Sequence, residues 1–173
     1  MSAAVPRASA GPTVEERAAR PYAYLRASVR MDEFPVIADR LGELIGWVSA
    51  QGAAFAGAPF FRFRTVDPAG ASEVEAGLPV LTPPAPEGDY RVGTLPSGRY
   101  AAIRHTGHPD GLFEALGTLT AWTERQGLTL DLTRSEPGGV ERWGCRLESY
   151  LTDPREEPDP NRWETELALR LAD

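Results

Sequence analysis

The sequence predicts an α+β fold in which a strand-helix-strand-strand unit occurs twice. The first observation behind this prediction is a repeated pattern, L-G-x-L-x-x-W-x-x-x-Q-G, at residues 41–52 and again at residues 116–127. The second is that both copies are flanked by similar strand-like segments. Strands grouped around only two helices indicate a mainly antiparallel sheet, with both helices on one face and a cleft between the two halves.

The two copies of the pattern are predicted to be helices. Leu, Leu and Trp recur at three-residue steps, which places them on one face of a helix. Gly52 and Gly127 fall where a helix ends on a left-handed glycine. We therefore expect helices over residues 34–51 and 109–126.

The segments around each helix are predicted to be strands, because they are rich in aromatic and β-branched residues and end in turn signals. They are listed here in pairs from the two halves: 22–29 and 99–105, 60–68 and 146–154, 73–80 and 163–171. A hairpin at residues 95–98 is expected to join the halves. Residues 1–20 are expected to be a mobile lead-in, and residues 21–173 one domain with pseudo-repeats at about 21–85 and 90–172.

The composition excludes several classes of protein. The 173 residues suffice for one domain with a core, and no apolar run is long enough to span a bilayer or act as a signal peptide, so we expect a cytoplasmic, bacterial protein without membrane contact. A net charge of -7 argues against direct nucleic-acid binding. All 18 basic residues are arginine, which excludes a lysine Schiff base and a Walker-type loop.

The stretch RLESYLTDP at residues 146–154 places a carboxylate on a predicted strand. Because side chains two residues apart share a face, Glu148 and Tyr150 point the same way, together with Arg146. A carboxylate buried in this way costs free energy unless something pairs with it. Two explanations remain open: Glu148 pairs with an arginine of the chain, such as Arg62, Arg64 or Arg146, or it receives a ligand.

Three motifs in family order resemble GyrI-like effector-binding domains. They are LPSGRYAAIRHTG at residues 95–107, EAGLPV at residues 75–80, and ESY at residues 148–150 followed by Asp-Pro at 153–154. The resemblance extends from about residue 22 to residue 172. It implies the duplicated α+β fold and a domain that binds small organic molecules, often aromatic and cationic, with the glutamate of E-x-Y facing the cation.

The resemblance also implies a stand-alone member of that family. Many relatives form the effector half of a transcription regulator, but no helix-turn-helix fits within the residues that precede this domain. Some stand-alone relatives are similar to hydrolases that open cyclopropane rings in DNA-alkylating natural products. If the chain is such an enzyme, Glu148 and Tyr150 are the expected catalytic residues.

The aromatic residues around Glu148 are expected to form the walls of the site. Matching the aromatics of the two repeats aligns Phe61 with Glu148, whereas counting back from Asp-Pro aligns Arg62 with it. We prefer the aromatic alignment, because arginines facing Glu148 would neutralise the cleft. The expected ligand-binding residues are Glu148, Tyr150, Trp143, Phe61, Phe63, Trp163 and Tyr100. No cofactor is expected, and no metal, because His105 and His108 lack a third ligand at sensible spacing.

Three functions follow from these observations. The first is binding of aromatic, including cationic, small molecules, as in multidrug or xenobiotic binding and sequestration. The second is hydrolysis of cyclopropane-containing genotoxins. The third is a protein-interaction role similar to that of a gyrase inhibitor, in which an acidic surface meets a basic protein. A separate regulator or gyrase stays open as a protein partner.

Overall fold

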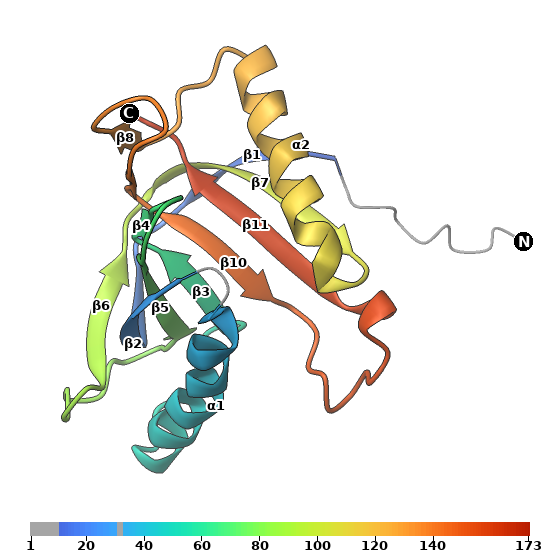
Figure 1. Ribbon diagram of the computed structural model, residues 1–173. Coiled ribbons are helices and arrows are strands. Elements are labelled where there is room, and N and C mark those ends of the chain that lie inside the picture. Colours follow the sequence, from blue (N-terminus) through green and yellow to red (C-terminus); the bar gives the residue numbers. More distant parts are fainter. Residues whose placement is uncertain (1–10, 31–32) are drawn as a thin grey trace, which may run out of the picture.

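An antiparallel sheet of eight strands forms the centre of the computed structural model, which describes residues 11–30 and 33–173 (Figure 1). In spatial order the strands are β1 (Thr13–Arg17), β7 (Gly98–Thr106), β11 (Glu164–Arg170), β10 (Arg146–Tyr150), β3 (Phe60–Phe63), β5 (Ser72–Pro79), β2 (Arg20–Val29) and β6 (Arg91–Leu95). A second sheet has the order β4 (Thr65–Val66), β9 (Glu141–Trp143) and β8 (Leu132–Arg134). The helices are α1 (Phe34–Ala50) and α2 (Leu112–Arg125), with short 3₁₀ turns η2 (Pro109–Gly111) and η3 (Pro160–Arg162).

The predicted duplication is confirmed by the order of the strands. β3 and β10 pair at the middle of the sheet, and β5 and β2 follow on one side as β11 and β7 follow on the other. Each half is therefore a strand, a helix and two further strands, related by a pseudo-twofold axis between β3 and β10. The fold is the α+β class expected from the sequence.

Both helices lie on the same face of the sheet (Figure 1). α1 packs on β2 and β5 through Leu44 and Val48, and α2 packs through Leu119 against residues of β7 and β11. Each helix ends as predicted, with Gly52 at φ 71° and Gly127 at φ 69°, in the left-handed region that suits glycine. The two helices stand on opposite sides of β10, and this separation positions the site described below.

Two very short connections curl the sheet. Residues 18–19 link β1 to β2, and residues 96–97 link β6 to β7, yet each link joins strands from opposite ends of the sheet order. The two outer edges of the sheet must therefore approach each other near these two connections. The expected hairpin at 95–98 is wrong: the turn exists, but β6 pairs with β2, and β7 pairs with β1 and β11.

The expected lead-in also needs a correction. Residues 13–17 form strand β1, which pairs along β7 from Thr13↔Ala102 to Arg17↔Gly98, so the ordered part of the domain begins before residue 21. The strand was missed because T-V-E-E-R has only one apolar side chain to indicate it. Residues 1–10 of the expected lead-in lie outside the described residues.

The face of the sheet away from the helices is the inside of the curl. Its apolar cluster contains Tyr22, Phe60 and Leu147, all of them buried. Phe60 needs a glycine on the neighbouring strand, because a Cβ at Gly77 would lie 2.4 Å from its ring. None of the described helices is both long enough and apolar enough to cross a membrane.

Candidate functional site

A cavity of about 300 Å³ opens between α2 and the middle of the sheet. Strand β10 supplies its most polar residues, and α2 with the turn before it supplies an apolar wall. The principal lining residues are Arg146, Glu148, Tyr150, Phe63, Leu167 and Leu169 from the sheet, and Pro109, Leu112, Phe113 and Leu116 from the helical side. A concave apolar pocket with a few convergent polar groups is the usual form of a small-molecule site.

Glu148 and Tyr150 form a hydrogen-bonded pair in this cavity. The Tyr150 hydroxyl donates to Oε1 of Glu148 at 2.9 Å. Among the described residues, Oε2 has no hydrogen-bond partner and the carboxylate forms no ion pair with an arginine. One carboxylate oxygen is therefore left for a ligand.

Burial controls the protonation of both groups. It raises the pKa of the Glu148 carboxyl, while the hydrogen bond from Tyr150 and the charge of Arg146 partly oppose that shift. Burial and the neighbouring Glu148 charge raise the pKa of Tyr150 well above its ordinary value. The tyrosine hydroxyl thus stays protonated as a donor, and the carboxyl is more basic than an exposed glutamate.

The pairing of β10 with β3 decides which first-half side chains face Glu148. Glu148 lies directly opposite Phe61, and Leu147 lies opposite Arg62. Phe61 and Phe63 therefore share the face of Glu148, as the aromatic alignment predicts, whereas Arg62 points into the curl and donates to the Tyr22 hydroxyl at 3.0 Å. The ring of Phe61 is buried and meets Tyr150 edge-on, with ring centroids 5.4 Å apart.

The structure brings some of the other predicted residues to this region and leaves two elsewhere. Trp143 lines a neighbouring cavity of about 690 Å³, which shares Phe113, Leu116 and Arg146 with the first. Tyr100 is buried on the opposite face of the sheet, where its hydroxyl donates to the Pro96 carbonyl at 2.6 Å.

Trp163 also lies away from the cavity. Its indole donates to the Glu157 carbonyl at 2.7 Å within the loop before β11, and it is not among the lining residues. It therefore holds the loop 151–163 together.

The predicted set of ligand-binding residues omits the leucines of the cavity, Pro109, and the two lining residues with the most distinctive chemistry, Phe113 and Arg146. Phe113 is 87% exposed at the start of α2, although it continues the three-residue step of Leu116 and Leu119 backwards by one position. Arg146 was recognised only as a possible partner of Glu148, yet its guanidinium lies over the rings of Phe63 and Trp143. The step of the helix pattern was the signal for Phe113, and the period-two pattern of the strand was the signal for Arg146.

The glutamate of the EAGLPV motif belongs to the opposite face and is fully partnered. Glu75 is completely buried, accepts from the Tyr22 hydroxyl at 2.5 Å, and pairs with Arg26 at 3.2 Å. A buried carboxylate with such partners stabilises the inside of the curl and is not available to a ligand.

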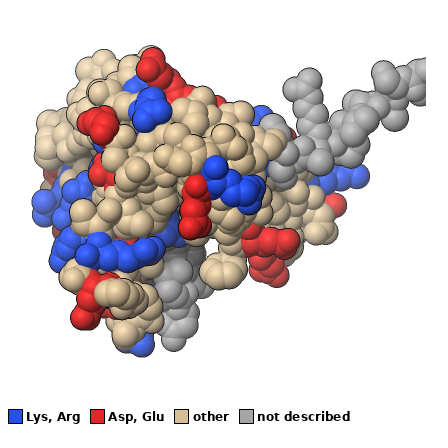
Figure 2. All heavy atoms as spheres, turned by 90° about the horizontal axis from the view of Figure 1, so that it is seen from above, with Lys and Arg blue, Asp and Glu red and all other residues tan. Residues whose placement is uncertain are grey.

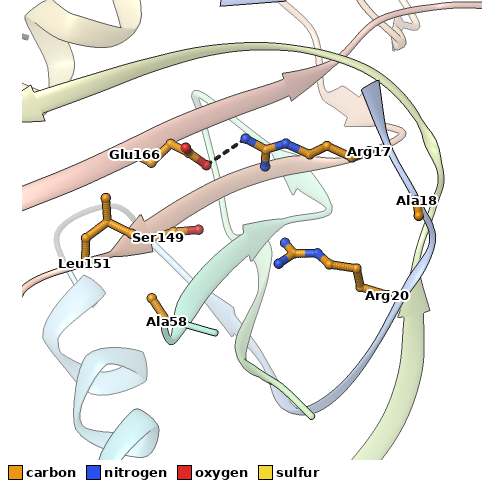
Figure 3. A pocket seen from close by; sticks show the side chains of 7 residues that line it. All are labelled: Arg17, Ala18, Arg20, Ala58, Ser149, Leu151 and Glu166. Carbon is orange, nitrogen blue, oxygen red and sulfur yellow. Dashed lines mark hydrogen bonds and ion pairs between the residues drawn. The ribbon is translucent and has the colours of Figure 1, made fainter. Parts of the chain in front are cut away.

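A different hollow, of about 400 Å³, lies on this same inner face (Figure 3). The Arg17 guanidinium there already pairs with Glu166 at 2.8 Å, and Arg20 and Ser149 complete a polar lining. It has none of the aromatic walls that surround Glu148, so we place the site on the helix side. Among the described residues no cluster of three His, Cys, Asp or Glu side chains is arranged to hold a metal ion.

Comparisons with known proteins agree with this architecture. The family model for the GyrI-like small molecule binding domain matches residues 11–172. No curated protein matches the chain.

Several solved structures share the fold at low sequence identity. The C-terminal domain of EcmrR has a TM-score of 0.71 at 17% identity, over 94% of this chain and 97% of that one. In the EcmrR–DNA complex the chain spans 57% of the longer protein. A hydrolase from Listeria innocua has a TM-score of 0.61 at 13% identity, over 94% and 92% of the two chains. SAV2435 bound to tetraphenylphosphonium has a TM-score of 0.61 at 11% identity, over 94% of each chain.

Proposed function

The chain belongs to the GyrI-like small-molecule binding domain family, and on that premise we propose that it binds aromatic molecules, cationic ones among them, in the cavity that contains Glu148. Binding of this kind serves the sequestration of xenobiotics, or their detection on behalf of a separate protein partner. The observation that carries the proposal is the free oxygen of the Glu148 carboxylate among aromatic and leucine side chains.

The physical reason is the cost of a half-buried carboxylate that has no ion pair among the described residues. Partial burial removes part of its hydration, and a cationic or hydrogen-bond-donating ligand restores the lost interactions. The rings of Phe63, Tyr150 and Phe113 add stacking and cation–π contacts. The structure of SAV2435 with an aromatic cation supports the choice of ligand class by analogy of fold.

The test is a titration with a cationic dye of the pyronin type, followed by fluorescence anisotropy. We expect micromolar binding by the wild type and a loss of about tenfold or more in Glu148→Gln, because the amide keeps the shape and the bond from Tyr150 but removes the charge. Tetraphenylphosphonium should displace the dye. Equal affinity of the two proteins for the dye would show that the carboxylate does not recognise cations.

A second function, hydrolysis, is favoured by the hydrogen bond between Tyr150 and Glu148 and by the raised pKa of that carboxyl. A carboxylate with a raised pKa is a better general base toward water. Water attacks a carbon of a strained cyclopropane, the ring C–C bond breaks, and its electron pair enters the conjugated carbonyl, which gains a proton. Glu148 takes the proton from the attacking water, and the carbonyl oxygen that receives the electron pair is protonated in turn. Tyr150 orients the water or donates a hydrogen bond to that oxygen.

Mass spectrometry separates turnover from binding. A cyclopropane-containing alkylating compound incubated with the wild type should gain the mass of one water, and both Glu148→Gln and Tyr150→Phe should slow this about 100-fold or more while still binding the compound. Conversion by either variant at the wild-type rate would exclude the two residues from catalysis. Binding without conversion by the wild type leaves the protein a binder.

A further inference from the structure

Two opposite charges stand side by side on the floor of the cavity. Arg146 and Glu148 are two residues apart on β10, so both side chains leave the same face, with about 7 Å between their positions along the strand. Both line the cavity, and in the described part of the chain no ion pair joins them. The cavity is therefore polarised along β10, with a negative and a positive end.

Arg146 stacks on aromatic rings and forms no ion pair with a carboxylate in the described part of the chain. Its guanidinium carbon lies 4.7 Å from the centroid of the Phe63 ring and 5.4 Å from that of Trp143. Within residues 11–30 and 33–173 it makes no side-chain hydrogen bond. Burial lowers the pKa of this guanidinium, against the opposing charges of Glu141 and Glu148. Its N–H donors are thus oriented by stacking but left unused.

The position of Arg146 gives the N–H donors of its guanidinium access to a ligand. It lines both the cavity of about 300 Å³ at Glu148 and the neighbouring cavity of about 690 Å³ at Trp143. A molecule that extends from Glu148 toward Trp143 passes the guanidinium. Because a planar guanidinium matches the two oxygens of a carboxylate, an acidic group on that molecule would satisfy it.

We propose that the preferred ligands are dipolar aromatic molecules, with a cationic or hydrogen-bond-donating group at Glu148 and a carboxylate or similar anionic acceptor at Arg146. This inference rests on the proposed function, because it assigns the ligand class of the same cavity. A ligand with both charges compensates two half-buried charged groups at once. A simple cation meets Glu148 but is repelled by Arg146, which makes the pair a selectivity device.

A matched pair of dyes tests this directly. Rhodamine 110 carries a free carboxylate, and rhodamine 123 is its methyl ester with the same aromatic cation. Fluorescence anisotropy should show wild-type protein binding the acid about tenfold more tightly than the ester. Arg146→Met keeps an apolar side chain of similar length over Phe63 and Trp143. It should lower the affinity for the acid by about tenfold and leave the affinity for the ester unchanged or higher.

Arg142→Met, at an exposed position on β9, is the matched control and should change neither affinity. Circular dichroism and Tm measured for each variant show that the dyes are compared on folded protein.

Wild-type affinity for the ester that equals or exceeds the affinity for the acid overturns the dipolar assignment while preserving the proposed function. An equal loss for both dyes in Arg146→Met also overturns it, since the arginine would then be structural. If the wild type binds neither dye, the proposed function fails, and this inference fails with it.

Discussion

At the scale of single residues, Glu148 links the stability of the protein to its proposed function. The carboxylate accepts one hydrogen bond and has no ion pair among the described residues. Burial disfavours its charged form, so the folded state binds a proton more readily at this position than the unfolded chain does. Ionised Glu148 therefore opposes folding in the absence of a ligand.

This link has a defined sign. In the folded protein the pKa of the Glu148 carboxyl lies above its ordinary value of 4.5. The loss of folding stability from its ionisation is therefore absent below that pH, and it develops as pH rises through the folded pKa. Glu148→Gln should match the wild type near pH 4 and be more stable at pH 8 by about 1 kcal/mol, or about 2–4 °C in Tm. Thermal melts from pH 4 to pH 8 measure it.

The exposed Glu156→Gln is the control for that series, because it removes a carboxylate of the same type from a solvated loop. Its Tm difference from the wild type should stay flat across the pH range. A Glu148→Gln variant that is less stable than the wild type at pH 8 would mean that the ionised carboxylate stabilises the fold.

Residue-scale prediction from the sequence worked for the relative facing of side chains within β10. The shared face of Arg146, Glu148 and Tyr150 was predicted by the period of two, and the strand pairing bears this out. Trp143 escapes the alternation because β9 ends there and β10 begins only at Arg146, so the indole can lie beside the Arg146 guanidinium.

Tyr100 was predicted to be a ligand-binding residue, but the structure places it away from the cavity. The register of β7 with β11 pairs Ala101 with Leu169, a cavity residue, and so sends Tyr100 to the other face. The register between two strands depends on partners distant in sequence, so it was not available from the local pattern.

At the scale of elements, α2 has two parts with different tasks. Its middle packs on the sheet through Leu119, which is fully buried, whereas Phe113 in its first turn is 87% exposed beside the cavity. The hydrophobic stripe of the helix therefore extends one turn beyond the core that it covers. Because Phe113 lines the cavity, we expect its ring to contact a ligand there.

Phe113→Ala tests this division of tasks. The variant should unfold within about 0.5 kcal/mol of the wild type, because the side chain is exposed, and should bind a cationic dye about 3- to 10-fold more weakly through lost ring contacts. Chemical denaturation and anisotropy titration provide the two readouts.

Leu119→Ala is the reciprocal control on the same helix. It should lose about 2–5 kcal/mol of stability from the cavity that it creates, while the protein that remains folded keeps its affinity. Unchanged dye binding by Phe113→Ala would remove the first turn of α2 from the site.

The helices were the elements most completely predicted by the sequence. Their leucine and tryptophan steps and terminal glycines are local signals, and both helices end at the predicted glycines. The pairing of the strands was less accessible, since the turn at 96–97 has the local chemistry of a hairpin but joins strands that pair with others. The residues of a turn determine that the chain reverses there, but they do not determine which strands pair in the sheet.

At the scale of the whole molecule, charge is distributed without a dominant patch on the face shown in Figure 2, where basic and acidic side chains are interspersed. The net charge of -7 is thus not gathered there into one acidic surface. Many of the arginines pair with nearby carboxylates, as Arg17 does with Glu166 and Arg170 with Asp131. The charges with the clearest chemical purpose are the two inside the cavity, and these contribute nothing to the net value.

The two short connections that curl the sheet also make the halves inseparable. β1 precedes the first half in sequence but pairs with β7 of the second, and β6 leads into the second half but pairs with β2 of the first. The outer edge of each half is thus covered by a strand that lies next to the other half in the sequence. In an isolated half, β3 or β10 would be an unpaired edge strand. A polypeptide of one half could satisfy both edges only by joining a second copy, with exchanged strands across a twofold axis. Because the two halves are covalently linked, strand exchange that would otherwise need two subunits takes place within one chain. The two halves can also differ in sequence, and Glu148 of β10 lies opposite Phe61 of β3.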